Sequence, residues 1–376
     1  MRFPEFSGEW KCTTIGNIGD IKNGPFGSVL HAEDYVENGI PIVTTEHFKT
    51  GLMPSDKFGI PQVSNEDYIR LKGYRLETND IVFSRVGSVD INAHVGIEQN
   101  GWLFSGRVLR VRPKYDIDSL FLHYALSTEA VKRDIRNRAV GQTMPSINTP
   151  ILSSTTIQLP KDLFEQKKVA HFLRLLDERI ITQNKIIEDL KKLKSAISER
   201  LFKGIEGSFV LLSDICDIVK GKQINGENLS ESGNYYVMNG GTEPSGYYSD
   251  YNVEANSISI SEGGNSCGYV QFNTLPFWSG GHCYSIQNIA DNVNNLYLYH
   301  YLKSNEDVIM KLRIGSGLPN IQKKDLAMFK IIVPKIERQI TISTFLSSLE
   351  RKVEIEERIQ NAMLKEKLYL LQQMFI

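Results

Sequence analysis

One long stretch has the clearest pattern of apolar and polar positions in the chain. Residues 164–202 contain no Pro and no Gly, and apolar residues recur there at intervals of three, four and seven. That is the pattern of a single stripe along an amphipathic helix, and the remaining positions carry mostly Lys, Arg, Glu and Asp, as the flank of a coiled coil does. The stripe is formed by Val169, Phe172, Leu173, Leu176, Ile180, Ile187, Leu190, Leu193, Ile197 and Leu201. The sequence predicts a helix longer than a compact domain needs, either an ordinary interdomain helix or a spacer between two modules.

The same pattern returns near the C-terminus, within a repeat that covers most of the chain. Residues 140–147 match 314–321 at an offset of 174, and Gln166 matches Gln339 at an offset of 173. Earlier matches pair 18–21 with 215–218, 41–43 with 235–237, 81–84 with 258–261, 104–106 with 278–280, and 121–124 with 297–300. The second helix is predicted from about Glu337 to the C-terminus, with Phe345, Leu349, Val353, Met363 and Leu370 on its stripe. The order is module, helix, module, helix, which favours the spacer.

Short strands and one helix are predicted within each module. In the first module, strands are expected at 18–21, 40–44, 80–85, 103–111 and 156–159, a helix at 119–137, and polar loops at 24–28 and 140–148. In the second, strands are expected near Ile215, Tyr235, Ser257, Val270, Trp278 and Cys283, a helix near Leu296 and a loop at Gly315. Both modules therefore read as mixed α and β structure.

Composition narrows the class of protein. The length of 376 residues suggests two or three domains, and apolar and charged contents are those of a globular protein. No run of eighteen apolar residues occurs and the N-terminus lacks the apolar core of a signal peptide, so no membrane span and a cytoplasmic location are expected. The four Cys form no CxxC pair, and the spacing of Cys267, His282 and Cys283 is not that of a zinc finger. Free thiols and no metal are expected.

No catalytic constellation is found in the sequence. The motifs GxGxxG, the P-loop, HExxH and GxSxG are all absent. Asn23-Gly24-Pro25-Phe26 superficially resembles the Asn-Pro-Pro-Phe site of amino-methyltransferases, but Gly24 replaces the first Pro and no glycine-rich cofactor loop accompanies it. The run Glu165-Gln166-Lys167 is interpreted as the solvated face of the long helix. The chain is therefore not expected to be an enzyme.

Two similar modules on two similar helices can fold with pseudo-two-fold symmetry. Antiparallel helices would relate the modules by about 180°, and B-DNA has the same two-fold relation, so each module could enter a groove about one turn from the other. Modules of different sequence would then read a bipartite, asymmetric site. The net charge of −1 gives no compositional support for DNA binding, so a partner would have to supply basic charge. The same plan also suits a coiled-coil protein-interaction scaffold without DNA recognition.

Short motifs distributed over the whole chain carry a family resemblance. They are Arg2-Phe3-Pro4-Glu5-Phe6 with Trp10, Gly24-Pro25-Phe26-Gly27-Ser28 followed by Asp34-Tyr35 and Gly39-Ile40-Pro41-Ile42, Asn239-Gly240-Gly241 followed by Pro244-Ser245-Gly246-Tyr247, Leu159-Pro160 before Glu165-Gln166, and Pro334 before Glu337-Arg338-Gln339. In this order they resemble the specificity (S) subunits of type I restriction–modification systems. Each motif alone is weak, whereas their repeated order is specific.

The resemblance implies an α+β fold with two tandem mixed α/β target-recognition domains, separated by two long antiparallel coiled-coil helices. The domains would span 1–160 and 208–334, and the helices would lie within 161–207 and 335–376. Each domain would read half of a bipartite site in double-stranded DNA, while the helices set the half-site spacing and dock two methyltransferase (modification) subunits. S-adenosylmethionine, ATP and Mg would be bound by the modification and restriction/translocase subunits, with no cofactor and no catalysis in this chain.

Base-reading residues are not held in fixed motifs in this family, so candidates are chosen by chemistry. Arg suits guanine, Asn and Gln suit adenine, and Lys more often contacts phosphate. The DNA-binding candidates in the first module are Lys22, Thr45, His47, Arg85, Ser88, Arg107 and Gln142. Those in the second are Lys220, Lys222, Asn239, Glu262, Asn265, His282, Arg313 and Asn320. The sequence leaves open whether the helices pair within one chain or between two chains.

Overall fold

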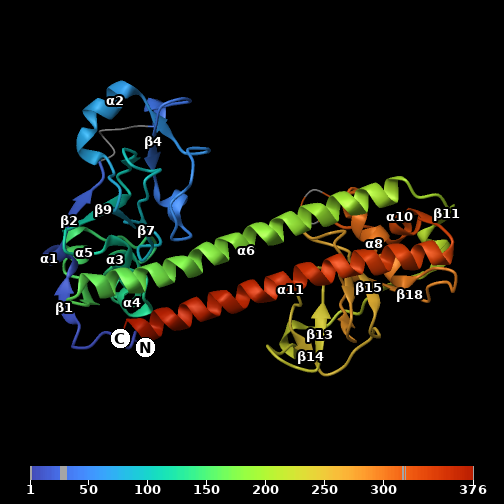
Figure 1. The fold of residues 1–376 in the computed structure, drawn as a ribbon. Coiled ribbons are helices and arrows are strands. Elements are labelled where there is room, and N and C mark those ends of the chain that lie inside the picture. Colours follow the sequence, from blue (N-terminus) through green and yellow to red (C-terminus); the bar gives the residue numbers. More distant parts are fainter. Residues whose placement is uncertain (1, 26–31, 316, 318, 376) are drawn as a thin grey trace. The chain divides into compact units, whose positions relative to one another are not determined.

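The chain divides into two compact units in the computed structural model, which describes residues 2–25, 32–315, 317 and 319–375 (Figure 1). Unit 1 combines Met1–Thr182 with Gln360–Ile376, and unit 2 is Gln183–Ile359. Most of the predicted loop at 24–28 and part of the loop at Gly315 lie outside the described residues. Unit 1 is therefore built from two segments that are far apart in the sequence.

Unit 1 contains ten described strands and five short helices besides the long ones. The strands are β1 (Lys11–Thr14), β2 (Gly19–Asn23), β3 (Tyr35–Val36), β4 (Ile40–Val43), β5 (Gln62–Val63), β6 (Ile81–Ser84), β7 (Asn92–His94), β8 (Leu103–Phe104), β9 (Val108–Pro113) and β10 (Thr156–Leu159). The helices are α1 (Ile15–Ile18), α2 (Asn65–Arg70), α3 (Ser119–Leu126), α4 (Glu129–Arg138) and α5 (Thr149–Ser153), with 3₁₀ turns η1 (Ala32–Asp34), η2 (Thr45–Phe48) and η3 (Lys72–Tyr74). They form an antiparallel sheet β2-β9-β6-β7, a mixed sheet β3-β5-β4-β8, and a pair β1-β10.

Unit 2 repeats this plan. Its strands are β11 (Ser208–Leu211), β12 (Asp217–Lys220), β13 (Tyr235–Met238), β14 (Tyr247–Tyr248), β15 (Ser257–Ser261), β16 (Val270–Asn273), β17 (Trp278–Ser279), β18 (Cys283–Gln287) and β19 (Lys330–Val333). Its short helices are α7 (Leu212–Ile215), α8 (Asn295–Ser304), α9 (Glu306–Met310) and α10 (Lys323–Ala327), with the 3₁₀ turn η4 (Gly226–Asn228). The sheets are β12-β18-β15-β16, β14-β13-β17 and β11-β19.

The two larger sheets share their register as well as their strand order. Ile21, Val111 and Ile81 lie in one row across β2, β9 and β6. The corresponding row across β12, β18 and β15 is formed by Ile218, Ile286 and Ile258. The sequence repeat paired 18–21 with 215–218 and 81–84 with 258–261, and this shared register confirms both matches.

Some element predictions were wrong in detail. Ile18 and Ile215 end short helical turns, and the strands begin only after them. The predicted strand 103–111 is two strands, because a turn at 105–107 moves the chain from the mixed sheet into the antiparallel one. The predicted helix 119–137 is also two helices, because the Thr128 hydroxyl donates to the carbonyl of Ala125 (2.8 Å) and Thr128 begins a new helix at its N-cap.

Two long helices are present where the apolar stripes predicted them. They are α6 (Leu163–Lys203) and α11 (Ile336–Met374), and they run antiparallel within each unit. In unit 2, Gln183 donates to Glu356 (2.7 Å) while Lys194, further along α6, pairs with the earlier residue Glu350. In unit 1, Asp177 pairs with Lys367. The pairing is thus within the chain.

The stripes differ from the prediction at two positions. Leu193 is 50% exposed and Phe345 is 46% exposed, so neither contributes fully to the seam between the helices. The helix propensity of Leu and the period of the pattern do not distinguish a seam position from its neighbour on the same side of the helix. Among the described residues, no helix is apolar enough over a sufficient length to cross a membrane.

A buried glutamine joins each long helix to the domain that precedes it. Gln166 accepts a hydrogen bond from the backbone N–H of Asp118 (2.9 Å) and donates to the carbonyl of Pro160 (3.0 Å). Gln339 makes the same two bonds with Asn294 N–H (2.7 Å) and the Pro334 carbonyl (2.8 Å). This explains chemically why a Pro and a Gln recur together in both halves.

The prediction that Glu165 and Gln166 form a solvated face is wrong. Glu165 is only 2% exposed, and its carboxylate accepts hydrogen bonds from Arg2 Nε (2.7 Å) and Trp10 Nε1 (3.1 Å). Trp10 itself packs against Phe121 and Phe375. The charged residue is buried because the N-terminal segment crosses the start of α6, which its helical period could not indicate.

Two buried histidines are expected to make the stability of the protein depend on pH. Burial lowers the pKa of His123 on α3 to about 3 and that of His300 on α8 to about 4. Because these values lie below the unfolded value of about 6.5, the contribution to stability is complete above pH 6.5 and is lost as the pH falls toward 4. Each histidine is expected to cost about 1.4 kcal/mol per pH unit in that range. Melting temperatures measured from pH 7 to pH 4 test this.

The matched comparison uses His123→Gln with His300→Gln, against His171→Gln on the exposed surface of α6. The double variant should show a shallower loss of stability between pH 6.5 and 4, and the control should follow the wild type. An unchanged slope in the double variant would assign the acid sensitivity to other groups.

Candidate nucleic-acid interface

Four polar segments of unit 1 meet at strand ends, and we call them loop cluster 1. Its segments are 23–25, 85–88, 105–107 and 140–146. Main-chain hydrogen bonds hold them together: Arg85 N–H donates to the Arg107 carbonyl (2.9 Å), and Gly87 N–H donates to the Pro145 carbonyl (2.8 Å). Ile147 N–H in turn donates to the carbonyl of Arg85 (2.9 Å). These main-chain bonds fix the backbone positions from which the side chains of the four segments project.

Unit 2 has an equivalent group of segments, loop cluster 2. Its segments are 220–222, 262–265, 279–282 and 314–320, of which 316 and 318 are outside the described residues. Glu262 N–H donates to the His282 carbonyl (2.9 Å), and Gly264 N–H donates to the Pro319 carbonyl (2.9 Å). Ile321 N–H donates to the carbonyl of Glu262 (2.8 Å). The same three bonds therefore hold both clusters.

A glycine directly after β2 in unit 1 and directly after β12 in unit 2 allows two segments of each cluster to cross closely. Gly24 N–H donates to the Val108 carbonyl (3.0 Å), and Gly221 N–H donates to the Cys283 carbonyl (2.8 Å). A Cβ at Gly24 would lie closer than 3.0 Å to the Ser105 carbonyl, and one at Gly221 would meet backbone atoms of 279–280 equally closely. Only glycine fits at these crossings.

The hydrogen bonds correct two pairings of the repeat. Val108 N–H donates to the Ser105 carbonyl (3.0 Å), and Cys283 N–H donates to the Gly280 carbonyl (3.0 Å). Ser105 therefore corresponds to Gly280, one residue later than the sequence match of 104–106 with 278–280. A Ser-Gly dipeptide occurs in both halves, at 105–106 and at 279–280, but the two dipeptides are displaced by one residue in the structure. The match of 104–106 with 278–280 is therefore wrong by one residue. Ser105 N–H donates to the Val43 carbonyl and Gly280 N–H donates to the Met238 carbonyl (both 2.8 Å). Val43 therefore corresponds to Met238, and the match of 41–43 with 235–237 is wrong by one residue.

Most of the candidate residues are brought together in the two clusters. In unit 1 these are Arg85, Ser88, Arg107 and Gln142, of which Ser88, Arg107 and Gln142 are exposed. In unit 2 they are Lys220, Lys222, Glu262, Asn265, His282 and Asn320. Asn239 lies beside loop cluster 2, where its Oδ1 accepts from His282 N–H (3.1 Å). Whether any of them contacts a base remains a prediction.

The remaining candidates lie beside the clusters or contact residues near them in unit 1. Lys22 is half-buried on β2 with Nζ 5.1 Å from the centre of the Tyr74 ring. Thr45 and His47 belong to η2, where His47 Nδ1 accepts from Thr44 N–H (3.0 Å), and burial lowers the pKa of His47. Arg313 is exposed immediately before loop cluster 2.

A buried carboxylate is the main electrostatic feature of loop cluster 2. Glu262 is 8% exposed, and its Oε1 accepts from Lys220 Nζ (2.6 Å) and from the Tyr284 hydroxyl (3.1 Å). Burial and the nearby Glu262 charge raise the pKa of Tyr284. Sequence reasoning missed Tyr284, because only the strand register, which sets Lys220 opposite Tyr284, brings it to the site.

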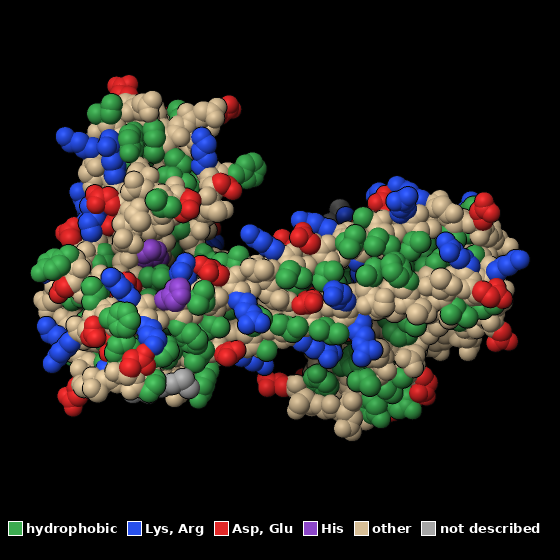
Figure 2. Space-filling model, viewed as in Figure 1, with side chains coloured by type: hydrophobic (Ala, Val, Ile, Leu, Met, Phe, Trp, Pro, Cys, Tyr) green, Lys and Arg blue, Asp and Glu red, His purple; other side chains and the backbone are tan. Residues whose placement is uncertain are grey.

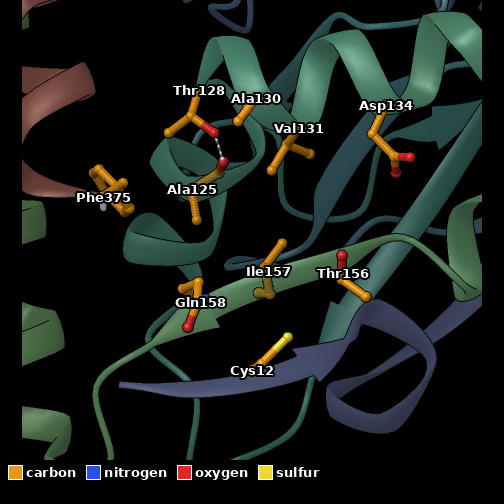
Figure 3. A pocket seen from close by; sticks show the side chains of 10 residues that line it. All are labelled: Cys12, Ala125, Thr128, Ala130, Val131, Asp134, Thr156, Ile157, Gln158 and Phe375. Carbon is orange, nitrogen blue, oxygen red and sulfur yellow. Dashed lines mark hydrogen bonds between the residues drawn. The ribbon is translucent and has the colours of Figure 1, made fainter. Parts of the chain in front are cut away.

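A cavity in unit 1 offers no comparable chemistry. It measures about 210 Å³ and lies between the strands β1 and β10 and the helices α3 and α4 (Figure 3). Its ionisable lining residues are Cys12 and Asp134, and the Thr128 hydroxyl is already bonded to the Ala125 carbonyl. The lining holds no nucleophile paired with a base. No group of three or more His, Cys, Asp or Glu suited to a metal occurs in the part of the chain that the structure describes.

Comparison with known proteins gives a match over nearly the whole chain. The family described as the type I restriction modification DNA specificity domain matches residues 7–192 and again residues 206–365. Two proteins of Methanocaldococcus jannaschii are similar along their length. The putative type I restriction enzyme MjaX specificity subunit is 28% identical, covering 94% of this chain and 90% of that protein. The type I restriction enzyme MjaVIII specificity subunit is 24% identical, covering 95% and 89%.

A solved structure shares the fold. The S subunit of a type I restriction–modification system from M. genitalium superposes with a TM-score of 0.68 at 18% identity, covering 100% of this chain and 99% of the other. The two matches of the specificity domain fall on the two halves of the repeat. The chain belongs to the family of type I restriction–modification specificity subunits, which recognise the DNA target and are non-catalytic.

Proposed function

We propose that each loop cluster reads one half of a bipartite, asymmetric site in double-stranded DNA. The observation that carries this is a common backbone frame with different side chains: the same three main-chain bonds hold both clusters, while the residues that they present differ in charge. A constant frame that presents different polar side chains is suited to reading different bases, because bases are distinguished by side-chain donors and acceptors in the major groove. Exposed Arg107, Lys222 and Arg313 are suited to phosphate or guanine.

We further propose that α6 and α11 set the distance between half-sites and dock two modification subunits. Support comes from large apolar side chains that stay exposed on these helices among scattered charges (Figure 2). They include Leu175, Ile186, Leu193, Phe345, Ile355, Leu364, Leu368 and Tyr369. S-adenosylmethionine belongs to the modification subunits in this proposal, and ATP and Mg to the restriction subunits.

DNA binding with and without the modification subunits tests the function. Because the chain has a net charge of −1, tight and sequence-selective binding is expected only in the complex, and it should weaken steeply with salt. The measurement is Kd for a target duplex and for a scrambled duplex between about 50 and 200 mM salt. A complex with equal affinity for both duplexes would refute target recognition.

An exchange of residues 208–334 for the corresponding part of another specificity subunit separates the two half-sites. Methylation mapping of the hybrid complex is expected to show one new half-site and one unchanged half-site. A change in both, or in neither, would contradict the assignment of one half-site to each loop cluster.

A further inference from the structure

Arg85 and Glu262 occupy the same point in the two backbone frames. Each donates its N–H, over 2.9 Å, to the carbonyl of the residue directly before β9 or β18, which is Arg107 or His282. Each accepts at its carbonyl from an isoleucine after the polar loop, over 2.9 and 2.8 Å. Each also follows the last residue of the central strand, β6 or β15. The two units therefore place opposite charges at one equivalent position.

The position in unit 1 offers hydrogen-bond donors. Arg85 Nη1 donates to the Gly106 carbonyl (3.1 Å), which fixes the guanidinium at the cluster while it remains half-buried. Arg107, its neighbour through the main-chain bond, is exposed. Guanidinium groups match the two acceptors O6 and N7 of guanine in the major groove.

The position in unit 2 offers an acceptor. Lys220 and Tyr284 hold Oε1 of Glu262, whereas the buried Oε2 receives no hydrogen bond from any described residue. His282 Nδ1 lies 3.9 Å from Oε2, beyond hydrogen-bond distance, and His282 stands at the place of Arg107. A buried carboxylate oxygen without a hydrogen bond raises the free energy of the folded state. An exocyclic amino group of a base, such as N4 of cytosine, could donate the missing hydrogen bond.

We propose that this equivalent position makes the two half-sites differ. Arg85 selects a guanine in one half-site, and Glu262 selects a base with an exocyclic amino group in the other. Lys220 and Tyr284 are positioning residues, because they orient the carboxylate through Oε1 and leave Oε2 without a hydrogen bond. Since Oε2 is buried, the base reaches it when the exposed His282 side chain beside it moves aside. The inference rests on the proposed reading of one half-site by each loop cluster.

The test uses the complete complex with its modification subunits and a set of duplexes in which each base pair of the target is changed in turn. Arg85→Gln is expected to reduce discrimination at one G·C pair of one half-site by roughly 10- to 100-fold. Glu262→Gln is expected to reduce discrimination at one pair of the other half-site to a similar extent. Discrimination at all remaining pairs should stay within about two-fold.

Matched controls keep the same chemical change away from the clusters. Arg133→Gln on α4 and Glu231→Gln before β13 alter exposed side chains and should leave every base preference as in the wild type. Melting curves of every variant show whether it is folded. Where Arg85→Gln or Glu262→Gln does not fold, the charge-retaining variant Arg85→Lys or Glu262→Asp is measured in its place.

Three results are distinguishable. If the folded variants keep the wild-type profile, or if either one relaxes both half-sites, the assignment to Arg85 and Glu262 is wrong although target recognition stands. If the wild-type complex itself shows no base preference, the proposed function fails instead. The inference is supported if Arg85→Gln loses discrimination at one pair of one half-site and Glu262→Gln loses it at one pair of the other half-site.

Discussion

Gly221→Ala is expected to lower the free energy of unfolding of unit 2 by about 3 kcal/mol and to abolish recognition of one half-site. The added methyl group would meet backbone atoms of Ser279 and Gly280, which cannot rotate away as the end of a side chain can. The turn that must move carries His282 and supports Glu262. Urea denaturation of the purified chain and methylation mapping of the complex measure the two effects.

Gly226→Ala is the matched control for this change. A Cβ at Gly226 meets no atom within 4 Å, and its backbone does not adopt a positive φ. Its stability should stay within about 0.5 kcal/mol of the wild type. The equivalent change in unit 1, Gly24→Ala, should damage recognition of the other half-site. If Gly221→Ala and Gly226→Ala behaved alike, the close crossing would have no energetic importance.

Gln339→Met is expected to destabilise unit 2 by about 3–5 kcal/mol, because it leaves buried backbone groups without partners at nearly unchanged side-chain volume. The groups concerned are the N–H of Asn294 and the carbonyls of Asn292 and Pro334. The loss should appear as faster hydrogen exchange in α8 and at the start of α11. Gln166→Met should have the corresponding effect in unit 1, around α3 and α6.

Arg338→Met is the control for the glutamine prediction, since this neighbouring side chain is exposed. Exchange rates in α8 should then match those of the wild type. If Gln339→Met changed stability no more than Arg338→Met does, the hydrogen bonds of the two buried glutamines would not contribute to the stability of the fold.

The repeat made much of the fold predictable. It predicted the two long helices and many of the strands, because apolar period and turn residues are local properties of the sequence. It did not predict short strands such as β1, β5 and β7, or the order of the strands within the sheets. It did not give the break at Thr128 or the burial of Glu165, because these depend on a side-chain hydrogen bond and on a distant N-terminal segment.

The candidate sites were predictable as segments and not as atoms. Polar loops at 140–148 and near Gly315 were recognised from composition, and the structure brings them to the strand ends. The equivalence of Arg85 with Glu262 required the main-chain hydrogen bonds, because insertions between the halves change the offset several times. Tyr284 was missed because only the pairing of β12 with β18 places it opposite Lys220.

The discontinuity of unit 1 has a consequence for synthesis on the ribosome. Its core contains Leu370, Leu371 and Met374, and Phe375 packs against Trp10 and Phe121. Unit 2 is continuous in the sequence, so all of its contacts are available once residue 359 has left the exit tunnel. The N-terminal unit, although made first, must wait with an exposed apolar surface until the last helix emerges. Nascent-chain folding would therefore finish in the reverse of the order of translation.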